Sequence, residues 1–212
     1  MNIRDLVFSA NLEALNNLLT RNPELANAEF SLPDNKATEH PLHRICDGVF
    51  SEYYSEETGL ELAKVFINHG ADVNVHRNEG IDSPLTAASS LHCDQLAHLY
   101  IQHGAHIDHK GCHGGTALHW ASWCGRDVLV KDLVQLAPDI NQRCIDFKST
   151  PLFWAIHGYK FGGTGNRHNQ ANCASILLDH GASPSIPNFE GSLPKQLLEA
   201  DDRELLTLFD LR

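Results

Sequence analysis

The stretch "QHGAHIDHKGCHGGTALHWAS", residues 102–122, contains two short patterns that recur along the chain. One pattern, "ALHWAS" at Ala117, aligns with "PLHRIC" at Pro41, "PLTAAS" at Pro84, "PLFWAI" at Pro151 and, more weakly, "LPKQLL" around Pro194. The other, "HGAHID", aligns with "HGADVN", "LAPDIN" and "HGASPS". Successive copies of the first pattern lie 43, 33, 34 and 43 residues apart. The chain therefore repeats one structural unit, and two of its copies are about ten residues longer than the others.

Each repeat predicts two short helices joined by a turn. A Ser, Thr or His precedes the first pattern, where a Ser or Thr hydroxyl can cap a helix and Pro suits the first turn. The second helix, for example residues 60–69, has apolar residues at helical spacing. Gly70, Gly104 and Gly181 then end this helix in the left-handed conformation. Because one repeat has too small an apolar face to be stable alone, neighbouring repeats must stack.

The segments "TALHWAS", "SPLTAAS", "TPLFWAI" and "HGADVN" resemble the T-P-L-H-x-A and G-A-D-x-N signatures of the ankyrin-repeat family. The resemblance covers nearly the whole chain. It implies an all-α solenoid of stacked helix-turn-helix units with short connecting hairpins. We therefore expect a single ankyrin-repeat domain over residues 1–212, with a helix pair at 1–28, repeats at 38–77, 78–110, 111–144 and 145–187, and a C-terminal cap at 188–212. The outer face of the cap is expected to carry Glu199, Asp201, Asp202 and Glu204.

Two ten-residue insertions, around residues 47–58 and 157–168, separate the two helices of the long repeats. The first is acidic and contains Tyr53 and Tyr54, whereas the second is basic and Gly-rich and contains Tyr159 and Phe161. Loop growth at an exposed turn costs little entropy, so the insertions are explained without any function. The alternative is a pair of arms that hold a partner or a ligand, because loops on rigid scaffolds often carry function.

The formal net charge of −11 excludes some classes of partner. It argues against nucleic acid and against an anionic membrane surface, both of which attract Lys and Arg, and favours a protein partner that is basic or neutral. The N-terminus has no secretory signal, and no apolar run is long enough to span a membrane. The six scattered cysteines include no CxxC pair and indicate reduced thiols. We therefore expect a cytoplasmic monomer.

The repeat itself accounts for several of the 14 histidines. His43 and His119 occupy the T-P-L-H position, where the resemblance implies a hydrogen bond to neighbouring backbone that ties adjacent repeats together. A second group precedes the Gly-Ala stop, where a basic side chain can meet the last helical carbonyls: His69, His103 and His180.

A potential metal cluster remains on one hairpin, namely His106, His109, Cys112 and His113. Zinc needs three or four ligands that converge at about 2.0–2.3 Å. The hairpins of the family are open, so the resemblance disfavours such convergence. We predict no metal and no cofactor.

In the family, the hairpin tips and one position of each first helix face a groove in which partners lie. The resemblance therefore implies contacts from Cys112, His113, Trp123, Phe147 and His157. Trp123 has the character of an interface hot spot, although it could instead pack against the next repeat. Trp120 and Trp154, which lie three residues into their helices, are expected in the core.

The function implied is protein–protein interaction through the concave face and the inserted loops, without catalysis. No matched acid/base pair or activated nucleophile can be identified among the scattered carboxylates and cysteines. The alternative is a small-molecule or metal-dependent site, enzymatic in one version, built from the inserted loops and the His-rich middle. An ordered pocket beneath Tyr53 and Tyr159 would support that alternative.

Overall fold

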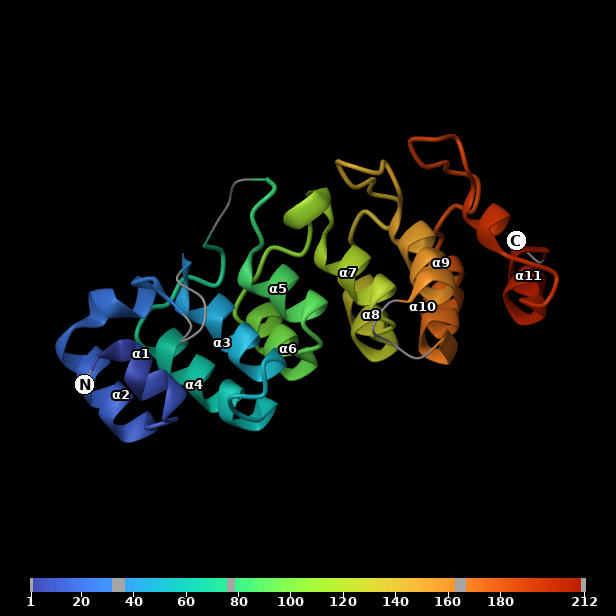
Figure 1. Ribbon diagram of the computed structural model, residues 1–212. Coiled ribbons are helices and arrows are strands. Elements are labelled where there is room, and N and C mark those ends of the chain that lie inside the picture. Colours follow the sequence, from blue (N-terminus) through green and yellow to red (C-terminus); the bar gives the residue numbers. More distant parts are fainter. Residues whose placement is uncertain (1, 32–36, 76–78, 163–166, 211–212) are drawn as a thin grey trace. The chain divides into compact units, whose positions relative to one another are not determined.

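The computed structural model describes residues 2–31, 37–75, 79–162 and 167–210. Residues 163–166, the Gly-rich part of the second expected insertion, and residues 76–78, the boundary between two expected repeats, lie outside the described residues. The described helices and strands follow one another as Figure 1 labels them. They are α1 (Ile3–Phe8), α2 (Leu12–Arg21), η1 (Pro23–Asn27), β1 (Phe30–Ser31), β2 (Thr38–Glu39), α3 (Pro41–Phe50), α4 (Glu56–Asn68), α5 (Pro84–Ser90), α6 (Asp94–Gln102), η2 (Cys112–Gly114), α7 (Ala117–Trp123), α8 (Asp127–Gln135), α9 (Pro151–Phe161), α10 (Arg167–Asp179), η3 (Pro194–Leu197) and α11 (Arg203–Asp210).

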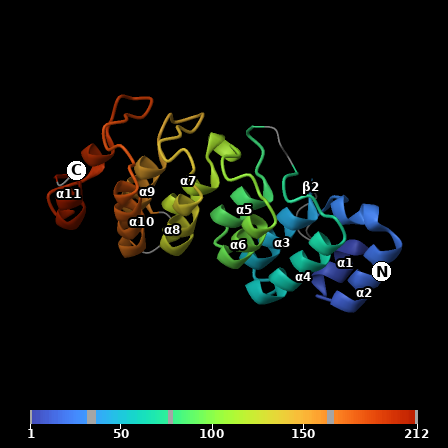
Figure 2. The same cartoon turned by 180° about the vertical axis from the view of Figure 1, so that it is seen from behind.

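The described helices fall into two compact units. Unit 1 contains α1 to α6 and the two strands, and unit 2 contains η2, α7 to α11 and residues 79–82. In unit 1, α4 packs between α2 and α6, while α3 packs on α5. In unit 2, α7 packs on α9 and α8 packs on α10 (Figure 2). Each unit is thus a stack of helix-turn-helix repeats, which confirms the expected all-α fold. The division into a single domain stays a prediction.

The first helix of each repeat begins where the capping residues predict. Ser83 Oγ accepts a hydrogen bond from the backbone N–H of Thr86, and Thr150 Oγ1 accepts one from Phe153. His40 caps α3 in the same way, through Nδ1. Each of these side chains satisfies one of the backbone donors that a helix start leaves open. The glycines expected to end the second helices all have positive φ values between 83° and 92°: Gly70, Gly104 and Gly181.

Asparagine side chains bridge consecutive repeats, a feature that the sequence patterns did not predict. Asn74 donates from Nδ2 to the carbonyl of Gly104 over 2.9 Å and accepts at Oδ1 from the N–H of His106 over 2.8 Å. Asn27 makes the same pair of bonds to residues 70 and 72 of the repeat that follows it, and Asn141 makes them to residues 181 and 183. One amide group therefore satisfies a donor and an acceptor of the neighbouring repeat, which fixes the spacing between the two.

Part of each insertion lengthens the helices on either side of it, where the sequence pattern predicted loop residues. α3 has 10 residues and α9 has 11, against 7 in α5 and in α7. The second helices of these repeats, α4 and α10, have 13 residues each, against 9 in α6 and in α8. Extending a helix that has already formed needs no new nucleus, which explains why the extra residues continue it. Tyr159 and Phe161 consequently lie on α9, and only Tyr53 and Tyr54 lie in a turn.

Gly158 allows α9 to approach the end of α7. A Cβ at this position would collide with the carbonyl oxygen of Trp123 and lie 2.9 Å from Nε2 of Gln170. Gln170 occupies this space because its Nε2 donates to that same carbonyl over 2.8 Å. The close approach sets the distance between α7 and α9.

The C-terminal cap is attached through a buried carboxylate, which corrects the expectation that Asp202 is on the outer face. Asp202 is 6% exposed and accepts hydrogen bonds from Lys160 Nζ and from the N–H of Glu199, each over 2.8 Å. Burial alone would raise the pKa of Asp202, but the hydrogen bonds from Glu199, Lys160 and Tyr159 together outweigh it and lower the pKa. Asp202 therefore stays ionised and ties the cap to α9. The other three acidic residues are exposed: Glu199, Asp201 and Glu204.

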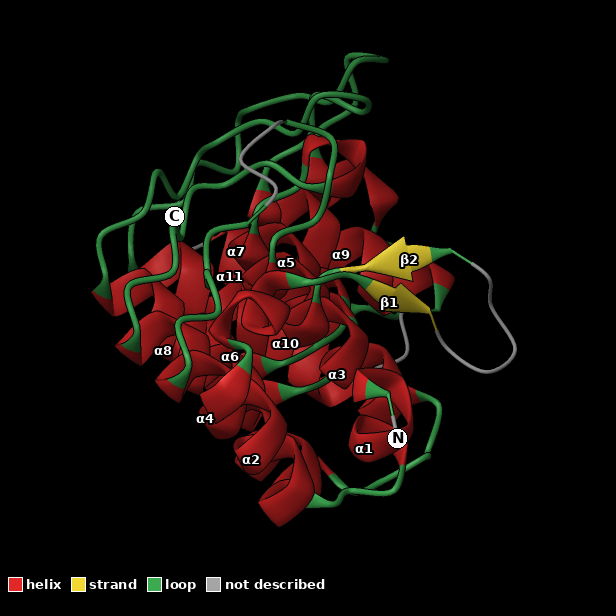
Figure 3. Cartoon of the chain, turned by 90° about the vertical axis from the view of Figure 1, so that its left-hand side faces the viewer, coloured by secondary structure: helices red, strands yellow, loops and turns green. Residues whose placement is uncertain are grey.

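Two further features lie outside the expected repeat. β1 and β2 form a short antiparallel pair in which Phe30 is opposite Glu39 (Figure 3), where the resemblance implied only helices and hairpins. All six cysteines are free thiols, and five of them are buried.

Asn74→Asp tests the bridge between repeats. The carboxylate cannot donate to the Gly104 carbonyl, so we expect the free energy of unfolding to fall by about 1–3 kcal/mol, measured by urea denaturation. Asp108 lies at the same position of the next repeat and provides the control, since Asp108→Asn should not lower stability. Unchanged stability in Asn74→Asp would contradict a structural role for the bridge.

Gly158→Ala tests the approach of α9 to α7. The added methyl group would meet a backbone carbonyl, which cannot rotate away, and we expect a loss of about 1–3 kcal/mol in the free energy of unfolding. Gly48→Ala in α3 is the matched variant, because its methyl group would meet only the outer end of the Tyr54 side chain. Thermal unfolding should rank Gly158→Ala as the less stable protein, and the reverse order would refute the close approach.

Candidate functional site

Three hairpins of unit 2 are joined by backbone hydrogen bonds. The hairpins are closed by bonds between Gly111 and Gly115, between Cys144 and Ser149, and between Asn188 and Ser192. The N–H of Ile145 donates to the His113 carbonyl over 3.1 Å, and the N–H of Phe189 donates to the Phe147 carbonyl over 2.9 Å. This hairpin ladder places the side chains of His113, Phe147 and Phe189 on neighbouring hairpins.

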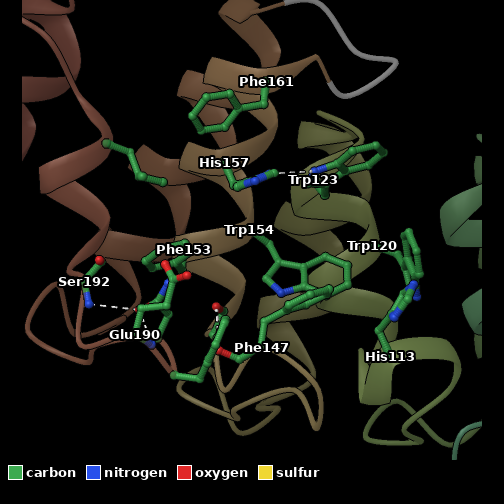
Figure 4. A pocket seen from close by; sticks show the side chains of 14 residues that line it. His113, Trp120, Trp123, Phe147, Phe153, Trp154, His157, Phe161, Glu190 and Ser192 are labelled. Atoms are coloured by element: carbon green, nitrogen blue, oxygen red, sulfur yellow. Dashed lines mark hydrogen bonds between the residues drawn. The ribbon is translucent and has the colours of Figure 1, made fainter.

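Two helices supply further aromatic side chains. On α9, Trp154, His157 and Phe161 are spaced by three and four residues and so share one face of the helix. On α7, Trp120 and Trp123 are three residues apart. Figure 4 shows these side chains and those of the hairpins around a common space.

Between the helices and the hairpin ladder lies a pocket of about 550 Å³, which we call the aromatic pocket. Most of its lining is aromatic or apolar. It is lined by His113, Trp120, Trp123, Phe147, Ser149, Phe153, Trp154, His157, Phe161, Asn188, Phe189, Glu190, Ser192 and Leu197.

The aromatic rings of the pocket pack against one another. Trp120 meets Trp154 edge-on with 5.0 Å between ring centroids, and it meets Trp123 edge-on at 6.3 Å. His113 lies 5.4 Å from Phe147, and His157 lies 4.8 Å from Phe161. Edge-to-face packing is a favourable geometry for aromatic pairs and holds each ring in place. The rings that line the pocket therefore support one another.

The two histidines of the pocket have different partners. His157 Nδ1 accepts a 3.4 Å hydrogen bond from Trp123 Nε1 (Figure 4), and burial lowers its pKa. His157 is therefore a neutral aromatic wall at neutral pH. His113 Nδ1 lies 2.9 Å from a carboxylate oxygen of Asp146 on the next hairpin.

His119 supports the pocket from within the core. Its Nδ1 accepts from the N–H of Thr116 over 3.1 Å, so Nε2 carries the proton and donates to the Ser149 carbonyl over 3.2 Å. It therefore ties α7 to the next hairpin, as the T-P-L-H position implied. Burial lowers the pKa of His119 to about 4.

Five of the nine predicted contact residues line the aromatic pocket: His113, Trp123, Phe147, His157 and Phe161. Trp154 is buried as expected, at 7% exposure, yet it also lines the pocket. Trp120 was expected in the core, but it is only partly buried, because one side of it lines the pocket.

The sequence reasoning missed the pocket residues of the last hairpin, Phe189 and Glu190. A signal was available, since "NFE" at residues 188–190 matches "DFK" at residues 146–148 in the preceding hairpin.

The other four predicted contact residues do not line the aromatic pocket. Cys112 is partly buried, and its N–H is held by Asp82. Tyr53 packs edge-on against Phe8 in unit 1, while Tyr54 donates to the Ile45 carbonyl over 3.4 Å. Tyr159 lies under the guanidinium group of Arg167.

The potential metal ligands have other partners. His109 Nε2 lies 2.7 Å from the Ile81 carbonyl, and His113 is paired with Asp146. Burial raises the pKa of the Cys112 thiol, with Asp82 adding to the effect, which disfavours the thiolate that a metal needs. Within the described ranges, no three His, Cys, Asp or Glu side chains converge on a point where a metal ion could bind.

Comparison with known proteins identifies the repeats. A family model described as "Ankyrin repeats (3 copies)" matches residues 52–144. An ankyrin repeat domain of known structure from Acinetobacter baumannii AYE superimposes with a TM-score of 0.77, covering 99% of this chain and 96% of that chain at 22% identity. This structural likeness concerns the fold alone.

Curated relatives share only part of their length with the chain. Human Ankyrin repeat and SOCS box protein 18 is 34% identical over 86 residues, which are 41% of this chain and 16% of that protein. Palmitoyltransferase ZDHHC13 of Mus musculus is 36% identical over 76 residues, which are 36% of this chain and 11% of that protein. Palmitoyltransferase AKR1 of Lachancea kluyveri is 32% identical over 36% of this chain and 9% of its own length. Such short matches transfer no enzyme activity.

In the part of the chain that the structure describes, no helix combines the length and apolar character needed to cross a membrane.

The buried His119 predicts that stability falls in acid. Its pKa is about 4 in the folded chain and about 6.5 when unfolded, so protonation favours unfolding as the pH falls from 6.5 to 4. This group alone should then remove about 3 kcal/mol. The stability advantage of the wild type over His119→Gln should shrink by that amount over this range, measured by urea denaturation at each pH. An advantage that does not change with pH would refute the assignment of a neutral, buried imidazole.

Proposed function

We propose that the chain is a member of the ankyrin-repeat family that recognises a partner protein through the aromatic pocket of unit 2, without catalysing a reaction. Ankyrin repeats are generally protein-interaction modules. Stacked repeats present a rigid, extended surface on which partners dock. In this chain the pocket lies where the first helices meet the hairpins, and the resemblance to the family implies partner contacts at that position.

The single observation that carries this proposal is the exposure of phenylalanine at the rim of the pocket. Phe161 and Phe189 are each 62% exposed and Phe147 is 43% exposed, and all three line the same pocket. A cluster of exposed aromatic side chains costs solubility and marks a contact site. Aromatic residues in desolvated pockets also carry most of the binding free energy of protein interfaces.

The rigidity of the pocket favours binding. The rings are held edge-on to each other, and the hairpins that bear them are held by backbone hydrogen bonds. Arg143 adds bonds from its guanidinium group to the carbonyls of Lys148 and Pro187, on neighbouring hairpins. Little side-chain entropy is then lost when a partner docks.

The net charge of −11 supports a basic or neutral partner, whose association would weaken as salt is added. We also propose, as expected from the sequence, that the chain binds neither nucleic acid nor a membrane and acts as a cytoplasmic monomer. Cys112, Tyr53, Tyr54 and Tyr159 stay predicted contacts outside the pocket.

A small-molecule site is the second candidate, and the volume of the pocket favours it. Small-molecule sites commonly measure about 300–1,000 Å³, and the aromatic pocket measures about 550 Å³. Native mass spectrometry of the protein purified from its own host would reveal such a molecule as an added mass. An added mass that Trp123→Ala removes would favour this candidate.

Affinity capture tests protein recognition. Trp123→Ala and Phe161→Ala each remove an aromatic wall of the pocket, and we expect each to lower capture of a host partner at least about tenfold. Capture is measured by quantitative mass spectrometry of the bound fraction, with the melting temperature recorded for each variant.

Phe50→Ala is the matched control, because Phe50 is 54% exposed, belongs to unit 1 and is not one of the residues that line the pocket. Its capture should equal that of the wild type. Equal capture by all four proteins, or a loss that follows the melting temperature alone, would show that the pocket is not the recognition site.

A further inference from the structure

One formally charged side chain lies among the mainly aromatic residues that line the pocket. Glu190 is the only Asp, Glu, Lys or Arg among the lining residues. Its backbone is fixed by the hairpin, because the N–H groups of Glu190 and Ser192 both donate to Asn188 Oδ1. Figure 4 places Glu190 on the side of the pocket opposite His113 and Trp120.

Nearby cations are engaged elsewhere. Lys160 donates to Glu199 and Asp202, and Lys195 is paired with Asp210. Lys148 does not line the pocket. Among the residues that the structure describes, no Lys or Arg forms an ion pair with Glu190. Its carboxylate can therefore accept a cation from outside the chain.

We propose that the aromatic pocket binds a Lys or Arg side chain of the partner protein, with Glu190 beside the charge and the Trp and Phe rings along the stem. A cation over an aromatic face is attracted by the negative face of the ring. The carboxylate adds charge complementarity, which the acidic balance of the chain extends beyond the pocket. This inference rests on the proposed function and names the chemistry of its partner.

Other occupants fit the same pocket less well. A purely apolar side chain would cover Glu190 without pairing its charge, and burying an unpaired carboxylate is costly. An acidic side chain would be repelled. One side chain does not fill about 550 Å³, so residues that flank the Lys or Arg also enter, next to the exposed rings of Phe161 and Phe189.

Tryptophan fluorescence provides a direct assay. The chain has three tryptophans, and all three line the pocket: Trp120, Trp123 and Trp154. The probes are capped pentapeptides of the form Gly-Gly-X-Gly-Gly, in which X is lysine, arginine, norleucine or glutamate. Norleucine keeps the apolar stem of lysine and lacks its charge. We expect the lysine and arginine peptides to change the tryptophan fluorescence saturably, with affinities at least about tenfold higher than that of the norleucine peptide. The glutamate peptide should not change the fluorescence.

Glu190→Gln tests the role of the carboxylate. We expect it to lower the affinity for the lysine and arginine peptides at least about threefold and to leave the affinity for the norleucine peptide unchanged. Glu204→Gln is the matched control, since Glu204 is an exposed carboxylate of the C-terminal cap in the same unit. It should keep the selectivity of the wild type. Circular dichroism checks that both variants are folded.

A norleucine peptide that binds as tightly as the lysine peptide would overturn the proposal, as would the absence of binding by both cationic peptides. Equal selectivity in Glu190→Gln and Glu204→Gln would overturn it too.

The two proposals fail separately. If the norleucine peptide binds as tightly as the lysine peptide while Trp123→Ala still lowers capture of the partner, protein recognition stands and the cationic occupant is rejected. If the lysine peptide binds while capture is insensitive to Trp123→Ala, the reverse holds.

Discussion

The stacking of the repeats depends on an asparagine side-chain amide that bridges two consecutive repeats at each of three junctions. Asn27, Asn74 and Asn141 each offer one donor and one acceptor, and each meets a carbonyl and an N–H of the following repeat. An amide carries its donor and its acceptor on separate atoms, so it can bond the carbonyl and the N–H at the same time. The bridge fixes the distance between repeats, which in turn determines how closely the helices and hairpins approach. In unit 2, the spacing of α7 and α9 and the register of the hairpin ladder define the aromatic pocket.

Much of the fold was predictable from local chemistry. The caps at Ser83 and Thr150 and the positive φ of Gly70 depend only on neighbouring residues, so a short pattern suffices to predict them. The insertions were misjudged because the patterns mark where a first helix begins but not where it ends. Asp202 was misplaced for a different reason: an isolated carboxylate in sequence looks solvent-exposed, and only the fold brings Lys160 to it.

Only some residues of the candidate site could be predicted from the sequence. His113, Trp123 and His157 followed from their place in the repeat, and the structure brings them to one pocket. Its depth could not be foreseen, because it requires three repeats to meet. One side of Trp120 lines the pocket, and Phe189 arrives through a backbone bond to Phe147. The match of "NFE" to "DFK" indicates that Phe189 lies at a hairpin tip, but it does not indicate which pocket the tip lines. Glu190 is missed for the same reason, since the pairing of hairpins decides which tip residue lines the pocket.

The hairpin ladder has an evolutionary consequence. The bonds between Ile145 and His113 and between Phe189 and Phe147 join backbone atoms, so they do not use the side chains at these four positions. Substitutions there can accumulate in copies of a duplicated gene while the scaffold persists unchanged. Descendants of one ancestor can thus acquire different partners through a few tip residues. Selection for binding and selection for folding then act on separate positions of the same repeat.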